Sequence, residues 1–421
     1  MTDTTYVLLF EGNSTDNGFA GGAGSFDVWI KGYNFSTGIS SGLPFGGSGN
    51  DFAERITAKN SGGYIFTGNS FSSDGNLTGN YGSSDIWIMS LQSNLSVAWS
   101  KHFGGSGDDR GIAAYQLADG NIMIFGNTQS SDHDVNNQHG INDVFVIKLN
   151  SLGDTLWTKT YGGTGADYIL DAKYVDDTTF VLVGVSNSSD GDFVFRDKLI
   201  PYSGFYYVID ENGNYVFGGS LGTMDETEMM FSDVIIESPY HAMAFGVTYT
   251  DSIYNCSDIY QGGGDICLVD FNGMSSVNPY LAGGANDDGV NFDMEEYVKA
   301  AKINTNQYAF CTNTRSTTLA PDFHGVMDVW LSFIEVQHVS VPEAEVFQIN
   351  VHPNPAENIV FVDNVKYGDV SQYEILDIQG KLLLHGQYNE DGIDISGLEK
   401  GMYLLKIKSG NSTGITQIVK Q

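Results

Sequence analysis

Residues 99–109 read WSKHFGGSGDD, and residues 157–167 read WTKTYGGTGAD. A second motif, an aspartate followed by apolar residues and often a tryptophan, recurs in the same phase. It occurs at Asp27–Ile30, Asp85–Ile88, Asp143–Val146, Asp265–Leu268 and Asp328–Leu331, with a degenerate copy at Phe205–Val208. Self-similarity at a roughly sixty-residue period indicates a repeat architecture.

Each period contains four strand signals separated by turns. Glycine pairs mark the same point of successive periods, at Gly46–Gly47, Gly104–Gly105, Gly162–Gly163, Gly218–Gly219 and Gly283–Gly284. The chain contains 52 glycines in 421 residues and 13% aromatic residues, a composition typical of short strands joined by tight turns. Four antiparallel strands per repeat predict an all-β protein built around a β-propeller.

The strand signals predict about six four-stranded blades of a propeller over residues 1–336. The first period lacks its leading strand and the last lacks its closing strand. We favour a six-bladed ring closed by pairing of its two ends. The alternative is a larger ring whose N-terminal sequence is missing.

Charge excludes several classes of function. Lys and Arg number 19 against 52 Asp and Glu, so the formal net charge is −33. Such a chain repels a phosphate backbone, and we expect no nucleic-acid partner. No apolar run reaches the ~18 residues of a membrane helix, so we expect no transmembrane segment.

The sequence after the repeats has a different character. Residues 337–346 contain Pro342 and acidic or small residues, which predict a linker. Residues 347–421 contain about seven short alternating segments, which predict a small immunoglobulin-like β-sandwich.

Three motifs in this last region occur in a set order. They comprise Pro353, Asn354 and Pro355, then Asp377, Gly380 and Lys381, then Gly397, Leu398, Gly401 and Tyr403. The region resembles the type A C-terminal sorting domain of type IX secretion cargo. The preceding repeats resemble uncharacterised propeller-like regions of such cargo in Bacteroidota, a family without an agreed activity.

The resemblance implies a secreted or cell-surface protein whose partner is the outer-membrane secretion machinery, reached through the C-terminal domain. Family members usually lose this domain on export. Cargo of this type also crosses the inner membrane on a signal peptide, and residues 1–10 do not resemble one. Together with the missing leading strand, this predicts an N-terminally truncated sequence.

Two loops before the Asp-x-aromatic strands have the spacing of calcium loops. Oxygen-bearing side chains occupy alternate positions, and an aspartate ends each loop. The candidate ligands are Asp74, Asn76, Thr78, Asn80 and Asp85 in one loop, and Asp132, Asp134, Asn136 and Asp143 in the other. The alternative is that these residues form Asx turns, and Ca²⁺ is the one cofactor that we consider.

Catalysis has weaker support in the sequence. The acidic turns at Asp51, Asp108–Asp109, Asp167 and Asp287–Asp288 recur in phase, which indicates a structural role because an active site is normally built once. The recurring Trp29, Trp87 and Trp330 predict core packing, with carbohydrate stacking as the alternative. We assign no catalytic residue.

We therefore predict a non-catalytic binding or structural module with an unknown extracellular ligand, a glycan or a protein. The alternative is a secreted polysaccharide hydrolase with its site in a non-repeated loop. The irregular segments Asp190–Asp197 and Asp225–Glu228 are candidates for that loop.

Overall fold

The chain forms two compact units, Met1–Glu335 and Val336–Gln421. The computed structural model describes residues 5–13, 26–34, 38–39, 44–75, 77, 79–176, 178–193, 202–221, 229–238, 241–248, 265–272, 276–282, 298–303, 307–314, 328–335, 350–363, 371–376, 382–388, 392–409 and 412–421.

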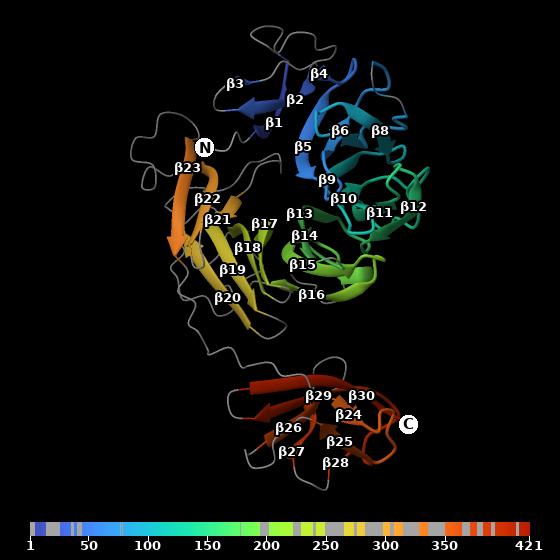
Figure 1. The fold of residues 1–421 in the computed structure, drawn as a ribbon, viewed down its shortest axis with the longest axis vertical. Helices are drawn as coiled ribbons and strands as arrows, with labels where there is room; N and C mark the ends of the chain where they lie inside the picture. The colour runs from blue at the N-terminus through green and yellow to red at the C-terminus, as the bar shows by residue number, and fades with distance from the viewer. Residues whose placement is uncertain are drawn as a thin grey trace. The chain divides into compact units, whose positions relative to one another are not determined.

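In its described residues the first unit forms six antiparallel sheets in chain order, and each sheet is one blade (Figure 1). Blade 1 contains β1 Thr5–Gly12, β2 Asp27–Asn34, β3 Gly38–Ile39 and β4 Pro44–Phe45. Blade 2 contains β5 Asp51–Ala58, β6 Tyr64–Ser70, β7 Asp85–Leu91 and β8 Val97–Phe103. Blade 3 contains β9 Asp109–Gln116, β10 Ile122–Thr128, β11 Asp143–Leu149 and β12 Thr155–Tyr161.

Blade 4 contains β13 Asp167–Asp176, β14 Thr179–Ser186, β15 Ser203–Asp210 and β16 Tyr215–Leu221, with the short 3₁₀ helix η1 Gly191–Phe193 between β14 and β15. Blade 5 contains β17 Met229–Ser238, β18 His241–Thr248, β19 Asp265–Asn272 and β20 Ser276–Ala282. Blade 6 contains β21 Lys299–Lys302, β22 Gln307–Thr314 and β23 Asp328–Glu335. The predicted all-β propeller of about six blades is confirmed.

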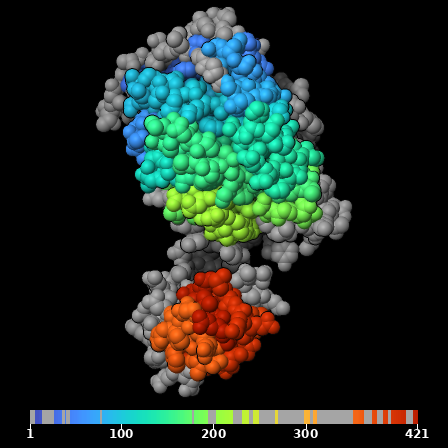
Figure 2. All heavy atoms as spheres, turned by 90° about the vertical axis from the view of Figure 1, so that its right-hand side faces the viewer, coloured from blue at the N-terminus to red at the C-terminus, as the bar shows by residue number. Residues whose placement is uncertain are grey.

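Burial follows the position of a strand within its blade. β5, β9, β13 and β17 lie nearest the centre in Figure 1, and β8, β12, β16 and β20 lie at the periphery. The third strand β7 is buried along its whole length, whereas most of the outer strand β8 is exposed or half-buried. Neighbouring blades cover both faces of the middle strands, which explains their nearly continuous apolar sequence. Figure 2 shows the outer surfaces of blades 2 to 4 as successive bands from cyan to yellow-green.

The apolar core lies between blades. One cluster joins Ile86 and Ile88 of blade 2 to Ile124, Phe145 and Ile147 of blade 3. Trp29 and Trp87 are fully buried, so they pack in the core as predicted; the side chain of Trp330 lies outside the described residues. This interdigitation between blades is what a repeat needs, because a single blade cannot bury both of its faces.

A glycine in the second strand lets the first strand bulge. A Cβ at Gly68 would lie 2.3 Å from the Phe52 carbonyl oxygen, and one at Gly126 would lie 2.3 Å from the Arg110 carbonyl oxygen. Opposite these glycines the register of the first strand shifts, between Ala53 and Arg55 in blade 2. A bulge redirects the side chain that follows it. This detail determines which residues face the centre of the ring.

The second unit contains two sheets. The first consists of β24 Asn350–His352, β25 Ile359–Asp363 and β28 Ile393–Asp394. The second consists of β26 Ser371–Leu376, β27 Leu382–Gln387, β29 Gly401–Ser409 and β30 Ser412–Lys420. Val360, Ile375, Ile393 and Leu405 are buried in a shared core, as the predicted sandwich requires.

Candidate functional site

Buried aspartates hold the glycine-rich turns. Asp109 accepts hydrogen bonds from the Gly105 N–H at 2.7 Å and the Ser130 hydroxyl at 2.7 Å. It also accepts one from the Thr128 hydroxyl. The same arrangement recurs around Asp51 and Asp167. These carboxylates satisfy buried donors in successive blades, and this geometry supports the structural role expected for the recurring acidic turns.

The first residue of each predicted calcium loop contacts the turn of the preceding blade. Asp74 Oδ1 accepts from the Ser48 N–H at 2.7 Å, and Asp132 Oδ1 accepts from the Ser106 N–H at 2.8 Å. These backbone contacts lower the pKa of both carboxyls. Asp134 Oδ2 accepts from the Gly104 N–H at 3.3 Å.

The remaining predicted ligands either bond to residues of their own blade or lie outside the described residues. Asn80 donates to the Ser70 carbonyl oxygen at 2.7 Å, and its Oδ1 accepts from the Gly82 N–H at 2.9 Å. Asn136 is exposed, and its backbone carbonyl accepts from the Thr160 hydroxyl at 3.0 Å. Asn76 and Thr78 lie outside the described residues.

The last residue of each loop is fully buried and has one oxygen without a hydrogen-bond donor. Asp85 Oδ2 accepts from the Tyr81 N–H and Asp143 Oδ2 from the His139 N–H, both at 2.8 Å, whereas Oδ1 of each has no partner. Burial, more than the neighbouring carboxylates, raises the pKa of Asp85 to about 7. Within the described residues, no three His, Cys, Asp or Glu side chains are grouped so that they could hold a metal by themselves.

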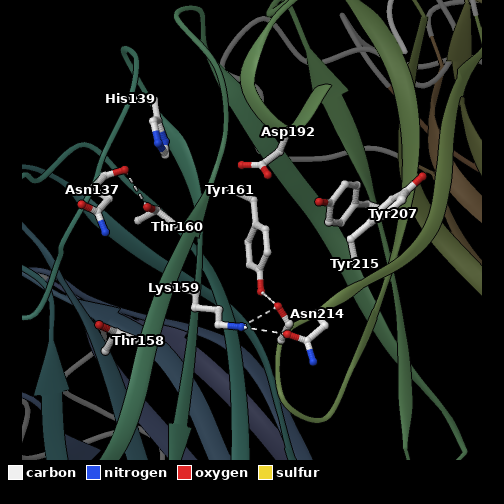
Figure 3. A pocket seen from close by; sticks show the side chains of 11 residues that line it. Asn137, His139, Thr158, Lys159, Thr160, Tyr161, Asp192, Tyr207, Asn214 and Tyr215 are labelled. Carbon is white, nitrogen blue, oxygen red and sulfur yellow. Dashed lines mark hydrogen bonds between the residues drawn. The ribbon is translucent and has the colours of Figure 1, made fainter. Parts of the chain in front are cut away.

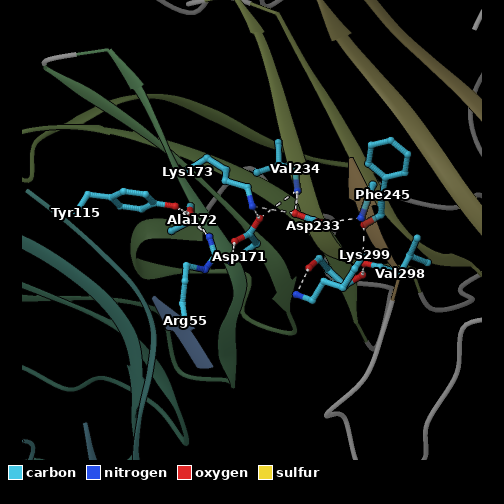
Figure 4. Close-up of polar contacts among 12 residues, drawn as sticks. Arg55, Tyr115, Asp171, Ala172, Lys173, Asp233, Val234, Phe245, Val298 and Lys299 are labelled. Carbon is cyan, nitrogen blue, oxygen red and sulfur yellow. Dashed lines mark hydrogen bonds and ion pairs between the residues drawn. The ribbon is translucent and has the colours of Figure 1, made fainter. Parts of the chain in front are cut away.

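Charged residues from different blades meet on the inner strands (Figure 4). Arg55, Asp171 and Asp233 each follow the bulge of the first strand in blades 2, 4 and 5. Tyr115 of β9 and Lys173 of β13 complete the group, which we call the hub network. Sequence analysis missed this network because the residue at the repeated position is arginine in blade 2 and aspartate in blades 4 and 5. The signal that could have revealed it was a charged residue within an inner strand made largely of small or apolar residues.

Direct contacts link the members of the hub network. Arg55 Nη2 lies 2.5 Å from Asp171 Oδ1, and Arg55 Nη1 donates to the Tyr115 hydroxyl at 3.0 Å. Lys173 Nζ lies 2.8 Å from Asp171 Oδ2 and 3.1 Å from Asp233 Oδ1. Asp233 Oδ2 accepts from the Ala300 N–H of β21 at 2.8 Å. The network therefore joins the inner strands of blades 2 to 6.

The two carboxyls of the hub network differ in their pKa. Burial opposes ionisation of Asp171, but the nearby Arg55 and Lys173 outweigh it and hold its pKa below the ordinary value. Burial and the adjacent Asp171 raise the pKa of Asp233 to about 6. Every oxygen of the pair accepts at least one hydrogen bond or ion pair. Neither carboxyl presents an oxygen to a substrate, and this geometry is that of a structural clasp.

A cavity of about 520 Å³ lies between blades 3 and 4 (Figure 3). Its lining includes the tyrosines of β12, β15 and β16 and polar side chains from two loops. The lining residues include Asn137, His139, Tyr161, Asp192, Tyr207 and Tyr215. Asp192, in the irregular segment noted from the sequence, is the only carboxylate in the described lining.

Two described motif residues of the C-terminal unit, Asn354 and Tyr403, form hydrogen bonds with its backbone. Asn354 donates to the Gln417 carbonyl oxygen at 2.9 Å and accepts from the Val419 N–H at 2.8 Å. Tyr403 of β29 donates from its hydroxyl to the Glu399 carbonyl oxygen at 2.8 Å. Pro353, Pro355, Gly397, Leu398 and Gly401 lie within the described residues, whereas Asp377, Gly380 and Lys381 lie outside them.

Residues 350–421 match the family described as the secretion system C-terminal sorting domain. No curated protein matches the chain. The predicted sorting domain is thus confirmed, and it indicates export by type IX secretion to the cell surface or the extracellular space. It also implies interaction with the type IX machinery. In the described part of the chain, no helix is long and apolar enough to cross a membrane.

Several solved structures resemble the chain at low identity. One is hydrazine synthase from Kuenenia stuttgartiensis, at 8% identity over 72% of this chain and 76% of that one, with a TM-score of 0.39. Another is PorZ, an essential bacterial surface component of the type-IX secretion system of Porphyromonas gingivalis. That match has 12% identity and a TM-score of 0.29, covering 94% of this chain and half of PorZ.

A third is a GH32 β-fructofuranosidase from Bombyx mori, at 10% identity over 88% of this chain and 87% of that one, with a TM-score of 0.28. None of these likenesses bears on the activity of this chain.

Proposed function

We propose that the propeller is a non-catalytic binding module that works outside the cell after type IX export. The observation that carries the proposal is the cavity between blades 3 and 4, which offers aromatic rings and a few polar groups. Sites for small ligands have this composition. Its described lining has one carboxylate, whereas glycoside hydrolysis usually requires two.

The hub network also favours binding over hydrolysis. A hydrolase in a propeller would need unlike groups that converge near the centre and reach the substrate. Asp171 and Asp233 do converge there, but Arg55, Lys173 and backbone N–H groups occupy their oxygens. The hydrolase alternative therefore has no accessible carboxylate pair in the hub network.

Affinity electrophoresis of the full chain tests this proposal. Native gels contain xylan, starch, mucin or gelatin, and an acidic protein without a propeller is the control. We expect slower migration of the chain in at least one gel, with no new reducing ends or peptide ends in matched solution incubations. Release of products would overturn the non-catalytic assignment, and unchanged migration in all four gels would overturn the binding assignment.

We further propose that Ca²⁺ binds at the joints between blades. The support is that one buried carboxylate oxygen in each of two blades, Asp85 Oδ1 and Asp143 Oδ1, has no hydrogen-bond donor. A buried carboxylate oxygen without a partner is costly, and a hard cation with backbone carbonyls and waters as further ligands would satisfy it. This site differs from the loop-contained site expected from the spacing, because Asp74 and Asp132 already accept backbone N–H groups.

A further inference from the structure

We infer that the cavity between blades 3 and 4 binds a neutral carbohydrate chain. This inference rests on the proposed binding function and names its ligand class. The first observation is a wall of three tyrosines. The rings of Tyr161 and Tyr207 have centroids 5.6 Å apart, and those of Tyr207 and Tyr215 are 4.9 Å apart.

The wall has a fixed part and an accessible part. Tyr161 and Tyr207 are 6% and 3% exposed, whereas Tyr215 is 51% exposed. An aromatic face carries partial negative charge, and the C–H groups of a sugar ring carry weak positive charge. Tyr215 therefore offers a stacking surface, and the two buried tyrosines hold it in place.

Polar groups face the same space. Figure 3 shows the Tyr207 hydroxyl and the Asp192 carboxylate directed toward the region beside the Tyr161 ring. Burial is the main cause of the raised pKa of Tyr207, and the neighbouring Asp192 adds to it. The Tyr207 side chain therefore stays a neutral phenol at physiological pH. A carboxylate acceptor and a phenol that can donate or accept suit sugar hydroxyls, which do both.

The charge of the cavity excludes an acidic polymer. Lys159 is the only ammonium in the described lining, and its Nζ already donates to the carbonyl oxygens of Asn212 at 2.7 Å and Gly213 at 2.9 Å. Asp192 adds negative charge, and the whole chain carries −33. A neutral chain avoids the repulsion that a uronic acid or sulfated chain would meet.

The cavity is preformed. The Tyr161 hydroxyl donates to the Gly213 carbonyl oxygen at 2.6 Å, and Asp210 Oδ1 accepts the N–H groups of Asn212 and Asn214 at 2.8 and 2.7 Å. These contacts fix the β15–β16 turn against β12. A rigid wall loses little conformational entropy when a ligand binds.

This joint differs from the preceding one. By strand register, the residues that correspond to Tyr161, Tyr207 and Tyr215 at the joint of blades 2 and 3 are Phe103, Ile147 and Thr155. The tyrosine wall thus occurs where the repeat is broken, in the blade with the degenerate Phe205–Val208 motif. A feature that serves only the fold would be expected to recur in both joints.

Isothermal titration calorimetry of the full chain tests the inference. The probes are xylohexaose, maltohexaose and mannohexaose, with hexagalacturonate as the acidic contrast. We expect saturable binding of at least one neutral hexasaccharide. The affinity for hexagalacturonate should be lower by a factor of about ten or more. No binding of any neutral probe, or stronger binding of hexagalacturonate, would overturn the inference.

Three variants locate the site. Tyr215→Thr introduces the residue of the preceding joint and should weaken binding about tenfold. Tyr207→Phe removes one hydroxyl and should weaken it by a smaller factor. Tyr81→Ala is the matched control, because Tyr81 is 50% exposed at another joint, and it should bind as the original chain does.

The outcomes separate this inference from the proposed function. Equal binding by Tyr215→Thr, Tyr207→Phe and Tyr81→Ala would place sugar binding elsewhere, so this inference would fail while the binding module stood. Retention by gelatin alone in electrophoresis would have the same meaning. Cleavage of a hexasaccharide would contradict the non-catalytic function itself.

Discussion

The Ser130 hydroxyl donates to Asp109 Oδ2 across 2.7 Å, and this contact joins the first strand of blade 3 to the loop after its second strand. Gly105 of the preceding turn donates to the same oxygen. One buried carboxylate therefore closes the glycine-rich turn on the blade that follows it. The equivalent contacts at Asp51 and Asp167 make this a repeated element of the fold.

Replacing that carboxylate should destabilise the propeller. Asp109→Ala leaves a backbone N–H and two hydroxyls without their acceptor, and we expect a loss of about 3 kcal/mol in the free energy of unfolding. Asp132→Ala is the control, because Asp132 is exposed and accepts its hydrogen bond from the same turn at the surface, and it should cost much less stability than Asp109→Ala. Urea titration followed by tryptophan fluorescence measures both; equal effects would contradict this role of Asp109.

Breaking the hub network should also be costly. Arg55→Leu leaves the fully buried Asp171 with Lys173 as its remaining ion-pair partner among the described residues, and we expect a loss of about 3 kcal/mol. Asp154→Ala breaks the exposed pair of Lys101 and Asp154 and should cost far less stability than Arg55→Leu, because water screens an exposed ion pair. Thermal unfolding distinguishes them, and a small effect of Arg55→Leu would contradict the description of the network as a clasp.

The raised pKa of Asp233 predicts a pH dependence. The folded-state pKa of about 6 exceeds the ordinary 3.8, so the folded chain binds this proton more tightly than the unfolded chain does. Its stabilising contribution is present below about pH 4 and is lost as the pH rises through 6, by at most about 3 kcal/mol. Asp233→Asn should therefore lose less stability than the original chain between pH 4 and 7. Parallel stability profiles of the two proteins in this range would contradict the shift.

Calcium should raise the thermal stability of the chain. At saturating ion we expect about 1–3 kcal/mol relative to EGTA, because an ion that binds only the folded state stabilises it. Asp85→Asn and Asp143→Asn should reduce this calcium-dependent shift, whereas Asp154→Ala should keep it. If the melting curves of the original chain in calcium and in EGTA coincide, the proposed ion sites are wrong.

The repeat was predictable because short motifs, each local in the sequence, mark every period. Glycine pairs and Asp-x-aromatic strands recur at one spacing, and the blades follow from them. The hub network was not predictable from the sequence, since Arg55, Asp171 and Asp233 become neighbours only when the ring brings three blades together. The tyrosine wall also depends on strands of two different blades, β12 of blade 3 and β15 and β16 of blade 4, although the degenerate copy at Phe205–Val208 marked the blade that departs from the repeat.

The calcium spacing illustrates a further limit. The spacing predicts that alternate polar residues of a loop converge on an ion, and this stays a prediction. It did not predict that Asp74 and Asp132 each accept a backbone N–H from the turn that precedes their own blade. Only the position of the next turn in space decides between these uses. Sequence spacing alone carries no information about that turn.

The most direct test of the central claim measures where the chain is located, inside or outside the producing cell. Quantitative mass spectrometry would map its peptides in the culture medium, surface and cell fractions of the producing bacterium and of a strain without a functional type IX system. We predict that propeller peptides appear outside the original cells without peptides from residues 350–421, and remain inside the deficient strain together with them. The same distribution in both strains, with residues 350–421 retained, would contradict the account.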